Sequence, residues 1–246
     1  MDNKKALRMA VTLAIINMPL LAQAADVSPV RITDGSTYTM TADSVINTGS
    51  NTTGIFVGYK DGGTIVGDNV TVTSDGYGIQ IQTYATGGVA GSGDCSIKLG
   101  KTIVEAKSSA VRVDSSSYGQ KATVILGAGS ILNSSANSAV YVTGKDSLLQ
   151  IGDGSTVTGN SYGATGAALA SSSGGKIEIG NGVTIGHDNI RGYDVNSIAY
   201  YRWMAMRAKA KVILQSATTV RFMPKGKVMA QMPFRRAIYH ILVLTV

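Results

Sequence analysis

One stretch of this chain decides the fold: Leu149-Gln150-Ile151-Gly152-Asp153-Gly154-Ser155-Thr156-Val157. Apolar and polar residues alternate up to a Gly-Asp-Gly turn, and the alternation resumes after it. A period of two is typical of a half-buried β-strand, and glycine beside aspartate or asparagine is typical of a turn. The stretch therefore predicts two short strands joined by a tight turn.

The same pattern returns along the chain, in copies that begin at 38, 64, 96, 123 and 176. The turn anchors are spaced by 25, 33, 27, 25 and 28 positions, and the longest interval holds an insertion: Ala42, Gly67, Gly100, Gly127, Gly152 and Gly180. A second strand pattern lies between anchors: Gly54-Ile55-Phe56-Val57, Gly78-Ile79-Gln80-Ile81, Ala110-Val111-Arg112-Val113, Ala139-Val140-Tyr141-Val142 and Ala167-Ala168-Leu169-Ala170. A repeat this short cannot bury its apolar face alone, so each copy must stack on the next.

We therefore predict an all-β protein: a single-stranded right-handed parallel β-helix, or solenoid, of about six coils over residues from about 35 to 190. A trimeric β-roll, an antiparallel sandwich and disorder are the alternatives, together with a propeller. A sandwich needs no repeat of similar sequence, and a propeller blade needs about 40 residues. The spacing favours the β-helix.

The coil prediction assigns an inside and an outside. One interior ladder is expected to contain the residues just before the anchors: Ile65, Leu99, Leu126, Ile151 and Ile179. Aspartate in place of Ile151 is expected to cost about 3 kcal/mol or more, because it buries an unpaired charge. Aspartate in place of Ser155, in the turn, is expected to cost about 0.5 kcal/mol or less.

The N-terminal segment, 1–24, has the pattern of a secretory signal peptide. Lys4, Lys5 and Arg8 precede an apolar stretch at 9–21 that is too short to span a membrane and is followed by Ala22-Gln23-Ala24. We expect cleavage between Ala24 and Ala25. A short core helix is the alternative, but proline at position 19 would break it.

The C-terminal segment differs in composition from the repeat region, which we place at 25–196. Residues 195–246 carry nine Lys and Arg and no acid, whereas 25–194 carry ten basic and fourteen acidic residues, a net charge of −4. The Gly-turns stop, the only Trp appears and five of the nine Met appear. A nucleic-acid or membrane patch is one interpretation. We favour another: 197–246 is a basic, non-repeat and poorly ordered tail produced by a frameshift, because a two-base shift at 211–220 permits Ser-Asn-Ile-Thr-Ile-Ser-Asn-Asn-Ser-Thr.

The sequence contains no catalytic, cofactor-binding or metal-ligating motif that we would name as a site, so we predict no cofactor and no enzymatic activity. Glu105 and Glu178 are the only glutamates, and most Asp stand in turns, where Asp is favoured for conformational reasons. The Gly-Asp-Gly pieces resemble calcium-binding β-roll repeats, but those recur about every nine residues. Cys95 is the only cysteine, which excludes disulfides within the chain and a cysteine-based metal site.

Two sets of residues remain as candidates for surface function. An amphipathic ring can stack on sugars or protein partners, and six tyrosines lie in or beside turns and strands: Tyr59, Tyr77, Tyr84, Tyr118, Tyr141 and Tyr162. A carbohydrate-active enzyme would instead require acids and bases that converge from neighbouring coils. The residues to inspect for that are Asp68, Asp94, Lys98 and Lys101.

The signal peptide, the Ile/Val-x-Ile/Leu-Gly-x-Gly-x-x-Val/Ile copies, the Ser/Asn/Thr spacers and the Ala-Val-Tyr-Val strand resemble passenger domains of autotransporter adhesins of the AIDA and pertactin type. The resemblance covers about residues 30–194 and concerns repeat style. It implies a Gram-negative β-helix that a C-terminal outer-membrane barrel carries to the cell surface. A barrel needs about eight or more amphipathic segments, so we expect this chain to be an N-terminal fragment without it.

Two functions of different classes follow. The first is a non-enzymatic adhesin-like stalk that binds a glycan or protein on a host surface or a neighbouring cell, or associates with itself, and binds no nucleic acid. The alternative is a secreted carbohydrate-active β-helix enzyme, a polysaccharide lyase or hydrolase. Export by the signal peptide predicts a periplasmic location for this truncated chain and the cell surface for a full-length relative.

Overall fold

In the computed structural model, the described residues form strands and turns, with no helix among them. The structure describes residues 25–84, 91–115, 119–160 and 168–187, and three strands at 200–202, 211–214 and 221–224. The pairings between these strands are parallel. The predicted all-β parallel solenoid is therefore confirmed. The predicted signal peptide, with Ala24, lies outside the described residues.

The strands form three sheets, named A, B and C here. Sheet A contains, in order, β1 (Asp26–Val27), β4 (Val45–Thr48), β7 (Val70–Ser74), β10 (Thr102–Ala106), β13 (Ile131–Ser134), β16 (Thr156–Gly159), β19 (Thr184–His187) and β22 (Arg221–Pro224). Sheet B contains β2 (Val30–Ile32), β5 (Ile55–Gly58), β8 (Ile79–Gln82), β11 (Val111–Asp114), β14 (Val140–Thr143), β17 (Leu169–Ser172) and β20 (Tyr200–Arg202). Sheet C contains β3 (Thr37–Thr39), β6 (Gly63–Gly67), β9 (Cys95–Leu99), β12 (Ala122–Leu126), β15 (Ser147–Ile151), β18 (Lys176–Ile179) and β21 (Lys211–Leu214).

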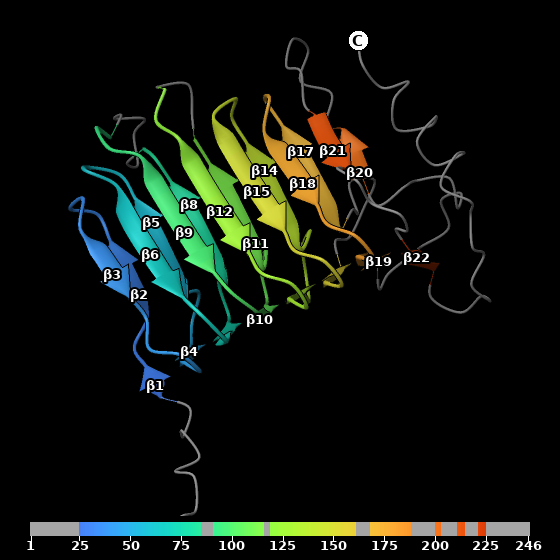
Figure 1. Ribbon diagram of the computed structural model, residues 1–246, viewed down its shortest axis with the longest axis horizontal. Coiled ribbons are helices and arrows are strands. Elements are labelled where there is room, and N and C mark those ends of the chain that lie inside the picture. Colours follow the sequence, from blue (N-terminus) through green and yellow to red (C-terminus); the bar gives the residue numbers. More distant parts are fainter. Residues whose placement is uncertain are drawn as a thin grey trace, which may run out of the picture.

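Each coil contributes one strand to each sheet, because the chain visits sheets B, C and A in that fixed order. Strands β2 to β19 run through this cycle six times. Because the last cycle ends at sheet A and does not return to sheet B, they make between five and six full turns, close to the predicted number of coils. In Figure 1 the strands of sheets B and C overlap in the view and follow one another along the long axis, and those of sheet A lie below them. The right-handed sense of the coil stays a prediction, in line with the general preference of parallel crossovers.

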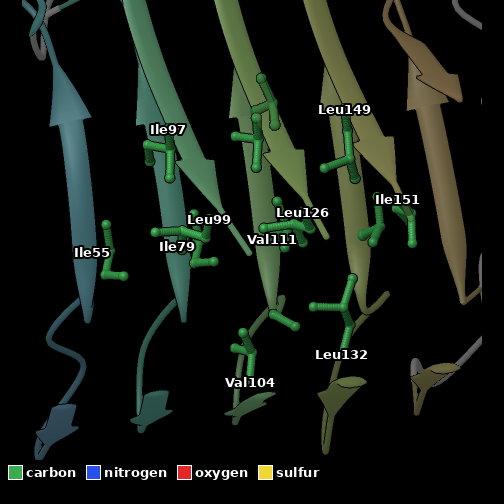
Figure 2. Packing of buried hydrophobic residues seen from close by; sticks show 14 of the residues in the cluster. Ile55, Ile79, Ile97, Leu99, Val104, Val111, Leu126, Leu132, Leu149 and Ile151 are labelled. Carbon is green, nitrogen blue, oxygen red and sulfur yellow. The ribbon is translucent and has the colours of Figure 1, made fainter. Parts of the chain in front are cut away.

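The hydrophobic core runs the length of the coil as ladders of inward side chains. Sheet C supplies one ladder and sheet B the facing one: Ile65, Ile97, Val124, Leu149 and Ile177, and Ile55, Ile79, Val111, Val140 and Leu169. Sheet A closes the triangle with Ile46, Val72, Val104, Leu132, Val157 and Ile185. Figure 2 shows labelled members of all three sheets pointing into the space between them. Alternation with a period of two therefore places every second residue inside.

The predicted interior ladder is correct for four residues and wrong for Ile65. Leu99 pairs with Leu126, and the same ladder continues through Ile151 and Ile179. Ile65 is buried but lies one ladder away, because Gly67 and not Ile65 pairs with Leu99. The error comes from counting back from the glycines: Ile65 precedes Gly67 by two positions, whereas the other four residues precede their glycines by one, and Gly67 itself lies one register position before Gly100.

The turns between sheets C and A need glycine for two separate reasons. A Cβ atom at Gly152 would lie 2.5 Å from both the Ala128 nitrogen and the Gly127 carbonyl carbon of the preceding coil. Gly154 has a φ of +65°, a left-handed conformation that costs other residues about 1 kcal/mol or more. Each Gly-x-Gly turn thus combines close backbone approach with a left-handed residue.

Ser155 is fully buried at this corner, so the premise that it is an exposed turn residue is wrong. Its hydroxyl donates to the Gly152 carbonyl at 2.7 Å and accepts from the Ser130 backbone N–H at 3.1 Å. Ser130 repeats this arrangement with Gly127 and Thr102 one coil earlier. Aspartate at 155 would bury a charge, and the small cost expected from the sequence does not hold.

We predict that Ser155→Ala lowers the free energy of unfolding by about 1 to 3 kcal/mol, because it leaves the Ser130 N–H and the Gly152 carbonyl buried without a partner. Ser135→Ala, at an exposed position, is the matched control and should change it by about 0.5 kcal/mol or less. Urea unfolding followed by circular dichroism measures both. Equal midpoints for the two variants would contradict the assignment of the Ser155 hydroxyl as a buried group that bonds to both the Ser130 N–H and the Gly152 carbonyl.

Three short segments of the predicted tail add one strand to each sheet, β20 beside β17, β21 beside β18 and β22 beside β19. The rest of 203–246 lies outside the described residues, so the poorly ordered character of 197–246 stays a prediction. The register brings Arg202 to a ladder whose earlier members are Val57, Ile81, Val113, Val142 and Ser171. The frameshifted origin of 197–246 stays a prediction.

Candidate functional site: an arginine and tyrosine face on sheet B

The outward positions of sheet B carry a ladder of large polar and aromatic side chains. Strand alternation puts one such residue per coil at the same level, and the pairing registers connect Arg31, Phe56, Gln80, Arg112 and Tyr141 on β2, β5, β8, β11 and β14. Neighbouring coils are about 4.8 Å apart, so adjacent members of the ladder are in contact range. The ladder defines a lateral face of the solenoid.

At its N-terminal end the face is built on Arg31. The guanidinium carbon lies 4.1 Å from the centre of the Phe56 ring and 5.3 Å from that of Tyr59, within the range of cation–π attraction. Arg31 also donates a hydrogen bond to the Tyr59 hydroxyl. The Phe56 ring is covered to 5% exposure and lies against Gly58, where a Cβ atom would be 2.4 Å from the ring. A bulkier residue at 58 would displace the ring.

A second cluster surrounds Arg112. Its Nη1 donates to the Tyr77 hydroxyl at 2.9 Å, and its Nη2 lies 3.4 Å from Asp114 Oδ2. The same carboxylate oxygen accepts from the Tyr84 hydroxyl at 2.7 Å. The centres of the Tyr77 and Tyr141 rings lie 5.3 Å and 5.5 Å from the guanidinium. One arginine therefore orients aromatic rings from two coils.

The electrostatics of this cluster favour the charged form of Arg112 and the neutral form of Tyr84. Burial by itself would lower the pKa of Arg112, but the Tyr77 hydroxyl and the Asp114 carboxylate outweigh it and hold that pKa above its usual value. Burial, and then the hydrogen bond to Asp114, raises the pKa of Tyr84. Arg112 is thus a cation and Tyr84 a neutral phenol at neutral pH.

Amide and hydroxyl side chains fill the face between and beyond these clusters. Gln80 accepts from the Thr53 hydroxyl at 3.0 Å and donates to Gln82 at 3.2 Å, and Gln82 donates to the Tyr84 carbonyl at 2.9 Å. On the far side, the Tyr141 and Ser172 hydroxyls are 3.2 Å apart. We call the whole surface the arginine–tyrosine face and define it by Arg31, Phe56, Tyr59, Tyr77, Gln80, Gln82, Tyr84, Arg112, Asp114 and Tyr141.

Four of the six candidate tyrosines, those at 59, 77, 84 and 141, contribute to this face, and Tyr118 and Tyr162 lie outside the described residues. Arg31, Phe56 and Arg112 also belong to the face and were not among the predicted residues. A signal for two of them existed, because Phe56 and Arg112 occupy the outward middle position of the recurring strand pattern. The face therefore presents aromatic rings, hydrogen-bonding groups and two arginines, Arg31 on its first strand and Arg112 on its fourth, where it is paired with Asp114.

The acid and base candidates do not gather. Asp94 precedes β9 and Lys101 follows it, so a five-residue strand, about 16 Å long, separates them. Lys98 points outward from that strand, and Asp68 stands in the turn near Gly100. None of the four forms an ion pair with another within the described ranges. Asp68 and Asp94 instead accept backbone N–H groups, of Asn69 at 2.9 Å and Lys121 at 2.8 Å.

The two glutamates also lie apart, Glu105 on sheet A and Glu178 on sheet C. Glu178 accepts from Gln150 Nε2 at 2.5 Å and forms an ion pair with Lys176, and these contacts, in that order, lower its pKa. The carboxylate borders a shallow depression of about 280 Å³ between β15 and β18. It is held as a charged, partnered group, which does not suit a general acid.

Cys95 and the possible metal ligands give no further site. Cys95 is buried at the start of β9, and burial, with a smaller effect of Asp94, raises the pKa of its thiol to about 12. Such a thiol stays protonated and unreactive at neutral pH. In the part of the chain that the structure describes, no three His, Cys, Asp or Glu side chains are grouped as a metal site requires.

Comparisons with protein-family models, with curated proteins and with solved structures find no match to this chain. Among the described residues no helix is long and apolar enough to cross a membrane. The parallel solenoid agrees with the fold that the autotransporter resemblance implies.

Proposed function

We propose that this chain is a secreted, adhesin-like β-helical stalk of the autotransporter passenger type, and that it acts by binding and not by catalysis. The observation that carries the proposal is the continuous arginine–tyrosine face, in which side chains from successive coils contact one another across β2 to β14. An extended lateral surface suits attachment to a large partner. Catalysis needs groups that converge on one bond.

The rigidity of the solenoid supports the same role. Its ladders bury apolar residues in every described coil, and each coil rests on its neighbours, so the structure resists bending along its axis. The N-terminal signal pattern supports action outside the cytoplasm. The alternative, a polysaccharide lyase or hydrolase, lacks geometric support, because the two glutamates lie on different sheets and Asp94 lies far from Lys101.

Beads coated with the mature chain, residues 25–246, test this proposal. We expect them to adhere to cultured epithelial cells or to bacterial cells above the level of albumin-coated beads. In parallel, incubation with acidic and neutral polysaccharides should release no reducing ends above a no-protein control. Release of new chain ends would contradict the stalk proposal, and so would beads that adhere no better than the albumin control.

A further inference from the structure

The arginine–tyrosine face has the dimensions of a track along the solenoid. Its central ladder from Arg31 to Tyr141 spans five coils, which are four steps of about 4.8 Å, or about 19 Å. The length that each sugar unit adds to an extended polysaccharide is similar to one step of this ladder. A linear glycan that lies parallel to the solenoid axis would therefore meet one outward side chain of the ladder with each successive sugar.

The rings on this track are held in place before any ligand binds. Tyr59, Tyr77, Tyr84 and Tyr141 are half-buried, and each hydroxyl contacts a neighbouring side chain. Rings fixed in this way lose little freedom on binding, which favours affinity. Aromatic rings with amide and hydroxyl neighbours suit the combined C–H faces and hydroxyls of sugars.

The composition of the face favours a sugar over a protein partner. The core of a protein interface is depleted of Lys, Glu and Asp but enriched in aromatic residues and Arg, so the distinction rests on how much apolar surface the face exposes. Here the outward positions carry glutamines, arginines, tyrosines and a carboxylate. Gln80, Asp114 and the one apolar ring, Phe56, are covered, so Gln82, the arginines and the tyrosines form the accessible part of the face. Tyr38, on sheet C, is the only large hydrophobic side chain that is exposed among the described residues.

Charge adds a preference at one end of the track. Arg112 forms an ion pair with Asp114, whereas Arg31 is exposed and forms no ion pair with a described carboxylate. A planar guanidinium stacked on rings presents its remaining N–H groups in a geometry that matches a carboxylate. The charge of Arg31 is thus available to an acidic group on the ligand.

From these observations we propose that the arginine–tyrosine face binds a linear glycan that carries carboxylates, with the sugars along β2 to β14 and a carboxylate at Arg31. This inference rests on the proposed binding function and names the ligand class of the same surface. Stacking on the tyrosines would supply affinity for any linear sugar chain. Arg31 would supply the preference for an acidic one.

Calorimetric titration of the mature chain with a galacturonate hexamer and with neutral cellohexaose tests the proposal. We expect the native chain to bind the acidic hexamer more tightly. Arg31→Ala should weaken binding of the acidic hexamer about tenfold, the usual effect of losing a charge-assisted hydrogen bond, and should weaken binding of cellohexaose less, because it removes the contacts that hold Tyr59 but no charge that a neutral sugar uses. Tyr141→Ala should weaken both ligands about three- to tenfold.

Tyr38→Ala is the matched control, because it removes an exposed tyrosine from sheet C and should leave both affinities unchanged. Circular dichroism of each variant separates loss of binding from loss of fold, and Tyr141→Phe provides a milder change at the same ring. The glycan proposal fails if neither hexamer binds, or if Tyr38→Ala weakens binding as much as Tyr141→Ala. Beads that still adhere to cells in that event would leave the stalk function standing with another kind of partner.

Discussion

Replacement of Ile151 by aspartate is expected to lower the free energy of unfolding by about 3 kcal/mol or more. Ile151 is 3% exposed and lies between Leu126 and Ile179 in an interior ladder of sheet C. Its ladder neighbours on both coils are apolar, so they offer the carboxylate no hydrogen-bond donor. In a solenoid each coil is stabilised by its neighbours, and damage to a central coil also weakens the coils on either side.

Ile125→Asp is the control that isolates burial, because it makes the same chemical change one position before Leu126 on the opposite face of the sheet. Ile125 is partly exposed and stands in an outward ladder between Lys98 and Gln150. We expect it to cost about 1 kcal/mol or less. Urea unfolding of both variants, followed by far-ultraviolet circular dichroism, measures the difference. Similar midpoints would show that the two faces of sheet C are assigned wrongly.

The sequence was sufficient for the fold because strand alternation and turn spacing both depend on local residues. The recurring strand pattern correctly places β5, β8, β11 and β14 in one sheet. The register was less certain, since glycine occurs for more than one reason. Gly67 is the last residue of β6 and pairs with Leu99, whereas Gly100 follows its strand, so positions counted back from the two glycines do not correspond, and Ile65 was assigned to the wrong ladder.

Burial at the corners and the membership of the surface site were not visible in the sequence. A serine after Gly-Asp-Gly has the composition of an exposed turn, and Ser155 is buried only because its hydroxyl bonds to the coil beside it. Likewise, alternation shows that Arg112 points outward but not which side chains it contacts. Its partners Tyr77 and Tyr141 lie 35 and 29 positions away, and only the coil register brings them together.

The close stacking of turns leads to the second large effect, that of Gly152→Ala. The new methyl group would lie 2.5 Å from backbone atoms of Ala128 and Gly127 in the preceding coil. Backbone held by a parallel ladder cannot move aside without breaking hydrogen bonds, among them that of the Gly152 N–H to the Leu126 carbonyl at 2.9 Å. We expect a loss of about 2 kcal/mol or more of unfolding free energy.

Two other glycines separate this steric effect from the loss of glycine as such. Gly49→Ala, in a turn with no atom within 4 Å of the added carbon and no left-handed φ, should change stability by about 0.5 kcal/mol or less. Gly154→Ala has equally open space but a φ of +65°, and should cost about 1 kcal/mol through backbone strain alone. Urea midpoints should therefore fall in the order Gly49→Ala, Gly154→Ala, Gly152→Ala. If Gly152→Ala is as stable as Gly49→Ala, successive turns are farther apart than the structure places them, because a methyl group fits only where the neighbouring backbone leaves room for it.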